Sequence, residues 1–358
     1  MNTPLRIDVT LGQHSYPLHI GPGLLKHTAL WRSYLRGVHV LLVSDTNVAP
    51  LYAQRLYAGL DGLSWSELTL PAGEPSKTLA NVRQVYEALS ALGANRDACV
   101  IALGGGVIGD LSGFAAASWM RGIDFLPLPT TLLAMVDASV GGKTGVNLPA
   151  GKNLVGAFHQ PRGVVIDTDT LATLPEREYL AGLAEVVKYG AIFAADFMDW
   201  LAIHSHALQE RDPQVLAETI ARSCRYKAAI VAQDPTEQGQ RALLNFGHSF
   251  AHALETTTGY GHLLHGEAVA IGMLQAARLS TRLGWARIED EQQLGKLLAA
   301  LHLPLEPPPG LNAETLLQHM RLDKKNQGGH LRLILWHGVG QAEMVTDVAE
   351  TDILAILG

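Results

Sequence analysis

The sequence predicts an α/β N-terminal domain of Rossmann type with a mostly parallel sheet, followed by a mainly α-helical domain. In the first half, short apolar runs alternate with segments of helical periodicity, which is typical of parallel strands joined by helices. From about Leu180 onward helical periodicity dominates, and HLRLILW near residue 330 is the clearest strand pattern there. A length of 358 residues is enough for two domains. We therefore expect an α/β domain over residues 1–168 and a mainly helical domain over residues 169–358.

The first domain is expected to alternate strands with helices. Its strands are VHVLLVSD (38–45), ACVIAL (98–103) and DFLPLPT (124–130). Its helices are ANVRQVYEALSAL (80–92), LSGFAAASWM (111–120) and TLLAMVDASV (131–140). PRGVVIDTDTLATLP (161–175) is expected to carry the crossover into the second domain. There the helices are GLAEVVKYGAIF, VLAETIARSCRYKAAIVAQ, FGHSFAHALETT, GEAVAIGMLQAARLSTRLG, EDEQQLGKLLAAL and AETLLQHMRLD.

The composition is that of a globular, acidic protein. Hydrophobic residues make up 47% and charged residues 17%, which favours a folded chain over a disordered one. The net charge of −7 gives no global attraction to nucleic acid or to an anionic membrane, and we expect neither as a partner. An anion would therefore have to be bound by a local cluster of cations.

The cysteines and the apolar runs predict the cellular setting. Cys99 and Cys224 lie far apart, which argues against a disulfide scaffold and a cysteine zinc site, so both are expected to be core residues. The first residues contain no cationic patch followed by a long apolar run, and no run of about 18 apolar residues occurs. We expect a soluble cytoplasmic protein.

A glycine-rich loop follows the second expected strand. Residues 104–109 read GGGVIG and match G-x-G-x-x-G at Gly104, Gly106 and Gly109, with a helix expected to open at Asp110. Glycines let the backbone approach a pyrophosphate, and a helix N-terminus supplies N–H donors. The alternative is a tight strand-to-helix turn that needs glycine for packing alone. The pattern favours dinucleotide binding.

The acidic partner for a ribose is harder to place. Asp124 is at a plausible distance along the chain but begins a strand, whereas Asp45 ends one. Because ligands bind at the carboxyl ends of parallel strands, Asp45 is the better candidate.

The letters GKT at Gly142, Lys143 and Thr144 imitate the end of an ATP-binding P-loop. That motif needs glycine five residues before Gly142, and Asp137 stands there. An ATP-dependent phosphotransferase is therefore not predicted.

Cations gather near glycine-rich turns in this acidic chain. Lys143, Lys152 and Asn153 lie in a polar, glycine-rich stretch (137–161) that is expected to form loops. Further cations stand nearby in sequence or on expected helices: Arg121, Lys188, Lys227 and Arg241. Each lysine alone is more simply a solvated surface residue. Their grouping indicates a site for a multiply charged anion.

Histidines and carboxylates in the second domain have the pattern of a metal site. His248 and His252 are four residues apart on one helix, and HLLHGE adds His262, His265 and Glu267. GLAEVVKYG adds Glu185 and Lys188, one turn apart. Catalytic zinc commonly takes three protein ligands and keeps one position open. Any one of these residues could instead be a core or capping residue, and the spacing leaves open whether His252 or His265 partners His248.

Taken together, these segments resemble the 3-dehydroquinate synthase family. The resemblance rests on six blocks in the family's order: GGGVIGDLSGFAAASWMRGI, LPTTLLAMVDASVGGKTGVN, GKNLVGAFHQP, GLAEVVKYG, LNFGHSFAHALE and HGEAVAIGM. A more distant resemblance is to glycerol-dehydrogenase-like polyol oxidoreductases. Ser249 stands where the family often has Thr, and Ala251 where it often has Gly, but neither change removes a charged or metal-binding residue.

The resemblance implies roles for particular residues. Glu185, His248 and His265 match the ligands of one zinc or cobalt ion, and His252 becomes a residue that assists proton transfer. The substrate-binding group is matched by Arg121, Lys143, Lys152, Asn153, Lys188, Lys227, Arg241, Asn245 and one of Lys324 and Lys325. NAD contacts are matched by Asp45, Glu74, Lys77, Gly105, Gly106, Val107, Asp110, Thr130, Thr131, Asp137, Lys143, Lys152, Thr170, Leu171, Ala172 and Thr173.

The activity that the resemblance implies is the conversion of 3-deoxy-D-arabino-heptulosonate 7-phosphate to 3-dehydroquinate and phosphate, with NAD used transiently, in a homodimer. Two rivals are a cyclase for another heptulose 7-phosphate and an NAD-dependent polyol dehydrogenase. The GKTGVN and GKN blocks argue against the dehydrogenase, which needs no phosphate grip.

Overall fold

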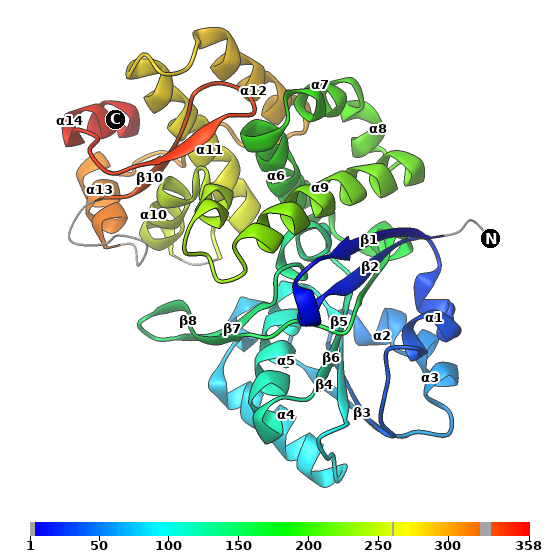
Figure 1. The fold of residues 1–358 in the computed structure, drawn as a ribbon. Coiled ribbons are helices and arrows are strands. Elements are labelled where there is room, and N and C mark those ends of the chain that lie inside the picture. Colours follow the sequence, from blue (N-terminus) through cyan, green and yellow to red (C-terminus); the bar gives the residue numbers. More distant parts are fainter. Residues whose placement is uncertain (1–3, 260, 323–330) are drawn as a thin grey trace. The chain divides into compact units, whose positions relative to one another are not determined.

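The computed structural model describes residues 4–259, 261–322 and 331–358 (Figure 1). The chain divides into two compact units. One comprises Met1–Leu174 with Leu216–Thr236, and the other Pro175–Val215 with Glu237–Gly358. No helix in the described residues is both long enough and apolar enough to cross a membrane.

A parallel sheet of four strands organises the first unit. Its order is β4 (Ser64–Leu70), β3 (His39–Asp45), β5 (Cys99–Gly104), β6 (Asp124–Pro129), and each neighbouring pair is parallel. All residues of β5 and β6 are buried, as expected where helices cover both faces of a sheet. The predicted α/β fold class is confirmed.

Side chains of the central strands alternate between two apolar cores. Leu41 and Val43 pack with α4 (Leu79–Ala91) and α5 (Gly106–Ser118). Val40 and Leu42 pack on the other face, with α1 (Thr28–Arg32), α2 (Ala49–Tyr52) and α3 (Gln54–Leu60). Figure 1 shows α4 and α5 on the opposite side of the sheet from α1 to α3. The same sheet therefore carries helices on both faces, and its strand ends stay free for loops.

The helix after the glycine loop begins earlier than predicted. It starts at Gly106, not at Asp110, so Asp110 lies within α5. A Cβ at Gly104 would lie 2.8 Å from Ile108, and Gly113 packs against Thr144, where a Cβ would lie 2.5 Å from its methyl carbon. These glycines draw the helix onto the sheet from its first turn. The next predicted helix is short: a π-helical segment, η5, covers Ala134–Ala138.

The expectation of loops around the glycine-rich cation segment is wrong. Lys143 opens β7 (Lys143–Leu148), and Lys152 and Asn153 lie on β8 (Gly151–Phe158); the two strands form an antiparallel hairpin. A Cβ at Gly156 would lie 2.2 Å from the carbonyl oxygen of Thr144, so the glycines serve close strand pairing. Composition indicated a loop because small and polar residues mask the alternation of a two-stranded ribbon.

A second sheet completes the first unit. It has the order β1 (Leu5–Val9), β2 (Tyr16–Gly21), β9 (Val164–Asp167), with β1 antiparallel and β9 parallel to β2. The first unit also contains short helical turns: η1 (Gly12–His14), η2 (Leu24–Lys26), η3 (Glu74–Ser76), η4 (Trp119–Arg121) and η6 (Thr168–Thr173).

The second unit is mainly helical, as predicted. Its elements are α6 (Glu176–Phe193), α7 (Ala195–Ile203), α8 (Ser205–Gln209), η7 (Gln240–Asn245), α10 (His248–Thr258), α11 (His265–Arg282), α12 (Ile288–Ala300), α13 (Ala313–Arg321), α14 (Glu350–Leu357) and the hairpin β10 (Leu333–Trp336) with β11 (Ala342–Val345). Most of α9 (Pro213–Gln233) groups with the first unit. The predicted domain boundary after residue 168 stays a prediction.

Both cysteines are free and buried, which confirms the expectation that they are core residues. Burial raises the pKa of both thiols, that of Cys224 to about 12.

Candidate active site

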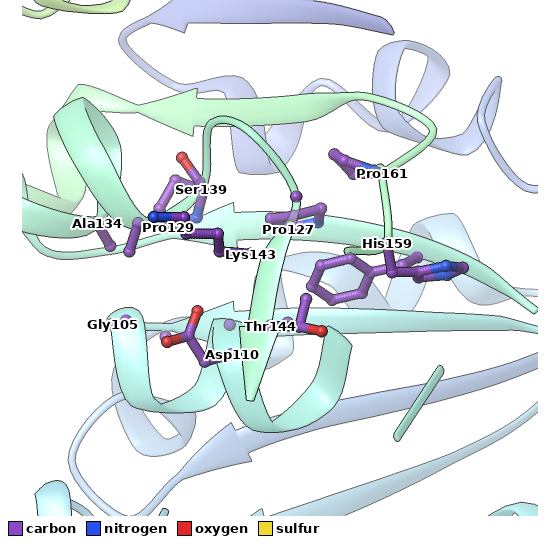
Figure 2. Close-up of a pocket in the computed structure, with 17 residues that line it drawn as sticks. Gly105, Asp110, Pro127, Pro129, Ala134, Ser139, Lys143, Thr144, His159 and Pro161 are labelled. Atoms are coloured by element: carbon purple, nitrogen blue, oxygen red, sulfur yellow. The ribbon is translucent and has the colours of Figure 1, made fainter. Parts of the chain in front are cut away.

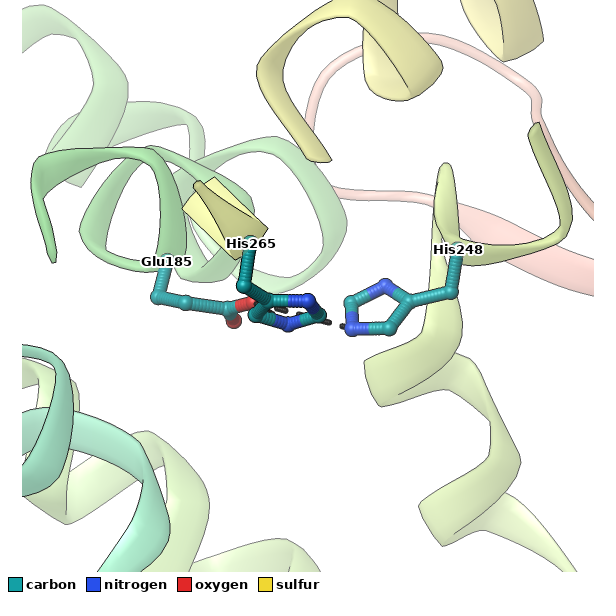
Figure 3. A group of neighbouring side chains, drawn as sticks. All are labelled: Glu185, His248 and His265. Carbon is teal, nitrogen blue, oxygen red and sulfur yellow. Dashed lines mark ion pairs between the residues drawn. The ribbon is translucent and has the colours of Figure 1, made fainter. Parts of the chain in front are cut away.

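Three side chains from three helices of the second unit converge on one point. Glu185 lies in the middle of α6, His248 is the first residue of α10, and His265 is the first residue of α11 (Figure 3). One ligand atom from each lies within 4.8 Å of the others. The Nε2 atoms of His248 and His265 lie 3.6 Å and 3.5 Å from the same oxygen, Oε1 of Glu185. Both imidazoles therefore face one carboxylate oxygen.

These spacings fit a divalent metal ion. Zinc lies about 2.0–2.2 Å from nitrogen and oxygen ligands, and tetrahedral angles then separate neighbouring ligand atoms by about 3.4 Å. The measured 3.5 Å and 3.6 Å need little adjustment. Two imidazoles and one carboxylate also leave a fourth position for substrate, as catalytic rather than structural zinc sites do.

Glycines let the three helices approach closely enough to form this cluster. Gly266 follows His265, and a Cβ there would lie 1.8 Å from the carbonyl oxygen of Ala181, one turn before Glu185 in α6. Gly247 precedes His248 with φ +77°, and a Cβ there would lie 2.5 Å from the backbone nitrogen of Met273 in α11. Each histidine is thus fixed in the chain next to a backbone contact that no other residue could make.

Neighbouring groups orient the three side chains. Lys188, one turn beyond Glu185 and 1% exposed, forms an ion pair with the other carboxylate oxygen, Oε2. Nδ1 of His248 lies 3.2 Å from the carbonyl oxygen of Phe246, which favours a proton on Nδ1 and leaves the Nε2 lone pair toward the cluster. Such contacts beyond the ligands fix both tautomer and orientation.

Glu255 is a site residue that the sequence reasoning missed. It is 4% exposed on α10, and its Oε1 lies 3.6 Å from Nδ1 of His265. Burial by itself lowers the pKa of His265, but hydrogen bonds to Glu185 and Glu255 and the charges of both carboxylates outweigh it and raise the pKa to about 9. The available signal was its position seven residues after His248, on the same face of one helix.

The remaining predicted metal candidates do not join the cluster as donors. The ring of His252 stands edge-on to that of His248 with centroids 5.7 Å apart. Glu267 is held by Arg177 at 2.7 Å, and His262 is exposed, with its carbonyl oxygen accepting a hydrogen bond from Arg177. In the structure His265, and not His252, joins His248 at Glu185. The assignment of these residues as metal ligands stays a prediction.

Two predicted substrate residues of the second unit, Arg241 and Asn245, lie on η7. Arg241 is 1% exposed, and Asn245 donates hydrogen bonds to Glu237 at 3.1 Å and to the carbonyl oxygen of Ala242 at 3.0 Å. Lys324 and Lys325 lie outside the described residues.

In the first unit, a pocket lies against the glycine loop (Figure 2). Four of the loop's glycines line it, with Asp110 beside them and the start of β7 opposite; among the lining residues are Gly104, Gly105, Gly106, Gly109, Ser139, Gly142, Lys143 and Thr144. A Cβ at Gly109 would meet no atom within 4 Å, unlike one at Gly104. Gly104 is therefore explained by packing, and Gly109 leaves open space beside the helix start.

These residues fit a dinucleotide. In the described part of the chain no side chain caps α5 at Gly105, so its first turn presents backbone N–H groups. Thr130, which follows β6 and is 4% exposed, has a buried hydroxyl with no hydrogen-bond partner among the described residues. Thr131, next to it, packs within 3.0 Å of the Cβ position of Gly105. Open donors and an unmatched hydroxyl are what a polyphosphate ligand would satisfy.

The two aspartates considered as partners for a ribose lie at opposite ends of the strands. β3 is parallel to β5, and Ser44 pairs with Leu103, so Asp45 ends its strand beside the glycine loop. Asp124 pairs with Cys99 at the other end of the sheet and is held by Arg36. Oδ1 of Asp45 already accepts hydrogen bonds from the backbone of Asn47 and Val48, which fixes the turn after β3.

The other predicted NAD contacts divide into two groups. Near the loop, Nζ of Lys77 lies 2.5 Å from Oδ2 of Asp110, and Val107 lies in the first turn of α5. Elsewhere in the unit, η6 carries Thr170, Leu171, Ala172 and Thr173, and the hydroxyl of Tyr52 contacts both Thr170 and Thr173.

Predicted anion-binding residues of the first unit differ in burial. Lys227 on α9 is 5% exposed and is paired with Asp137 at 2.7 Å. Lys143 and Asn153 are exposed, Lys152 is half-buried, and Arg121 is exposed with φ +67°. The structure therefore brings Lys227 to Asp137, and Lys152 and Asn153 to one end of the β7–β8 hairpin.

Family models match most of the chain. One described as 3-dehydroquinate synthase N-terminal matches residues 67–181, and one described as 3-dehydroquinate synthase C-terminal matches residues 182–326. A 3-dehydroquinate synthase of Xanthomonas campestris pv. campestris (strain 8004) is 58% identical over 355 residues, covering 97% of this chain and 96% of the relative.

Solved structures of related cyclases share the fold. 2-epi-5-epi-valiolone synthase from Streptomyces hygroscopicus subsp. jinggangensis 5008, with NAD+ and Zn2+ bound, has a TM-score of 0.88 at 32% identity, covering 96% of this chain and 95% of that one. 2-deoxy-scyllo-inosose synthase, complexed with carbaglucose-6-phosphate, NAD+ and Co2+, has a TM-score of 0.89 at 28% identity, covering 99% of both chains. Glycerol dehydrogenase from Schizosaccharomyces pombe shares the fold alone, with a TM-score of 0.64 at 17% identity over 94% of this chain and 86% of that one.

Removing a member of the cluster is expected to abolish metal retention. Glu185→Gln removes the charge and His248→Ala removes a nitrogen donor, so either variant should lose at least about 100-fold in zinc affinity. Metal content after dialysis against a competing chelator measures this. His262→Ala is the matched control, because His262 is exposed and outside the cluster. A metal-replete Glu185→Gln variant would contradict the assignment.

A methyl group at Gly266 is expected to separate the helices that carry the cluster. Gly266→Ala forces α11 away from Ala181 and should weaken metal binding even though every ligand is retained. Gly295→Ala in α12 is the control, since a Cβ there would lie 3.7 Å from its nearest neighbour, an ordinary contact. Metal titration and thermal unfolding of both variants test the expectation, which fails if the two behave alike.

Proposed function

The chain belongs to the 3-dehydroquinate synthase family, and on that premise we propose that it converts 3-deoxy-D-arabino-heptulosonate 7-phosphate to 3-dehydroquinate and phosphate. The observation that carries the proposal is the convergence of Glu185, His248 and His265 in a chain that is 58% identical to a 3-dehydroquinate synthase over nearly its full length. NAD and one zinc or cobalt ion are the proposed cofactors.

Each cofactor supplies chemistry that side chains lack. When bound, NAD accepts and returns a hydride, and a divalent metal lowers the pKa of a hydroxyl on the carbon to be oxidised. Glu185, His248 and His265 would hold the metal, with Lys188 keeping the Glu185 carboxylate in place through its second oxygen. Because the hydride is returned, the overall reaction is redox neutral, and NAD is needed only in catalytic amounts.

The NAD site is proposed at the glycine loop. Backbone N–H groups at the start of α5 would bind the pyrophosphate, and the Thr130 hydroxyl would gain the partner that it lacks among the described residues. The proposed contacts are Asp45, Glu74, Lys77, Gly105, Gly106, Val107, Asp110, Thr130, Thr131, Asp137, Lys143, Lys152 and Thr170–Thr173. The parallel sheet supports this choice, because dinucleotides bind at the carboxyl edge of such sheets.

The phosphate ester is proposed to bind to the cations of the hairpin and their neighbours. Lys152, Asn153 and Arg121 would hold the phosphate. The phosphate would leave by elimination, because a ketone at the oxidised carbon would acidify the proton on the neighbouring carbon, which lies between the ketone and the carbon that carries the phosphate. His252 would move a proton near the metal. The other proposed substrate contacts are Lys143, Lys188, Lys227, Arg241, Asn245 and one of Lys324 and Lys325.

The proposal extends to organisation and setting. We assign NAD binding to residues 1–168 and metal and substrate binding to residues 169–358, and we propose a homodimer that acts in the cytoplasm. Two buried free thiols support a reducing compartment.

A single reaction tests the activity. Metal-loaded protein is incubated with 3-deoxy-D-arabino-heptulosonate 7-phosphate and less than one equivalent of NAD, and phosphate release and NADH absorbance are followed together. The expected result is many phosphates released per NAD without lasting NADH, with 3-dehydroquinate as the product. Turnover only of a heptulose 7-phosphate lacking a carboxylate would indicate a different cyclase, and NADH accumulating with a polyol would indicate a dehydrogenase.

Lys152 tests the proposed phosphate grip. Losing a charge-assisted contact to a dianion should cost about 2 kcal/mol, or roughly thirtyfold in kcat/KM for the phosphate ester. Steady-state kinetics of Lys152→Ala and inhibition by inorganic phosphate measure the loss. Lys296→Ala is the matched control, because Lys296 is an exposed lysine on α12. Equal kinetics for the two variants would remove Lys152 from the site.

A further inference from the structure

The side chain of Asn147 joins three separate segments of the first unit. Its Nδ2 donates a hydrogen bond to Oε1 of Glu74 at 2.7 Å, and its Oδ1 accepts one from the backbone nitrogen of Asn153 at 2.9 Å. Its own backbone nitrogen donates to the carbonyl oxygen of Lys77 at 2.9 Å. Asn147 sits where the β7–β8 register shifts, between Val146 and Leu148, so its side chain can reach past its own hairpin.

On one side, the contacts of the Asn147 amide extend toward the glycine-loop pocket. Glu74 begins the short turn η3, and Lys77 follows it with only 5% of its surface exposed. Lys77 continues the chain of contacts to Asp110 at 2.5 Å. Asp110 lines the pocket beside Gly105, as Figure 2 shows.

The other end leads to the cations of the hairpin. Asn153 has φ +53°, a left-handed conformation that costs energy for a residue other than glycine. The hydrogen bond from its backbone nitrogen to Asn147 holds that conformation. Lys152 precedes it directly, so the path of β8 at Lys152 depends on the same contact.

We propose that Asn147 is a positioning residue that sets the Glu74–Lys77 turn and the Lys152–Asn153 turn relative to each other. It would touch neither ligand. This inference rests on the proposed function, because those two turns are where NAD and the phosphate ester are proposed to bind. Only an amide serves both ends at once: a carboxylate at 147 could still accept from Asn153, but it would face the carboxylate of Glu74 without a proton to donate.

That asymmetry provides the test. Asn147→Asp keeps the contact to Asn153 and breaks the contact to Glu74, so the Kd of NAD should rise about tenfold while the KM of the sugar phosphate stays within about twofold. Asn147→Ala breaks both contacts and should raise both constants. NAD binding is measured by calorimetry on the metal-loaded protein without substrate, and KM by phosphate release.

A second pair of variants exchanges the amide and the carboxylate between positions 147 and 74. It distinguishes a positioning role from general damage to the fold. In the Glu74→Gln background, the amide introduced at position 74 can donate to a carboxylate at 147, so adding Asn147→Asp should change the Kd of NAD by less than about twofold. Asn312→Asp is the control for the charge change, because Asn312 caps α13 in the other unit and aspartate caps a helix equally well.

The outcomes divide cleanly. The inference is overturned if Asn147→Asp leaves the Kd of NAD unchanged. It is also overturned if Asn147→Asp weakens NAD binding equally in the wild-type and the Glu74→Gln backgrounds. If Asn147→Ala does not fold, the comparison of Asn147→Asp in the wild-type and Glu74→Gln backgrounds still tests the inference. Coupling between positions 74 and 147 without turnover of the named substrate would uphold the inference and reject the proposed activity.

Discussion

The candidate metal centre depends on the close approach of α6, α10 and α11. Backbone packs directly on backbone where Gly266 meets Ala181 and where Gly247 meets Met273, and no side chain could fit between them. Each of these glycines is bonded to a histidine of the cluster. The close backbone contacts therefore also bring the histidines that carry the candidate donor atoms close together. Backbone packing at these glycines therefore holds the three candidate donors close together within the protein itself.

The parallel sheet imposes the corresponding constraint in the first unit. Strands that run in one direction bring their carboxyl ends to one edge, so Asp45, the glycine loop and Thr130 meet there although they are far apart in sequence. The hairpin β7–β8 adds Lys143 from a separate segment, against α5 at Gly113. The pocket shares Gly104 and Pro129 with this end of the sheet, so its position follows from the strand order, although Asp45 and Thr130 do not line it.

The sequence predicted the features that follow from periodicity or from adjacency in the chain. Apolar runs identified β3, β5 and β6, and the glycine spacing identified the loop. It could not separate His252 from His265, because i, i+4 spacing shows one helix face and says nothing about which other helix packs there. The hairpin was mistaken for loops because its glycines serve strand pairing. Asn147 carried no pattern, since its partners come from other segments. The spacing of Glu255 from His248 placed it on the same helix face but did not show that His265 packs beside it.

The buried lysines differ from the exposed lysines in how their charges are balanced. Lys77, Lys188 and Lys227 are each paired with a carboxylate, Asp110, Glu185 and Asp137 in turn, so their charges are balanced where they lie. Buried pairs of this kind hold geometry but attract a distant anion weakly. At the metal centre the balance has a further effect. Since Lys188 already pairs with Glu185, a divalent ion held by Glu185, His248 and His265 would keep more of its positive charge and would lower the pKa of a hydroxyl near it.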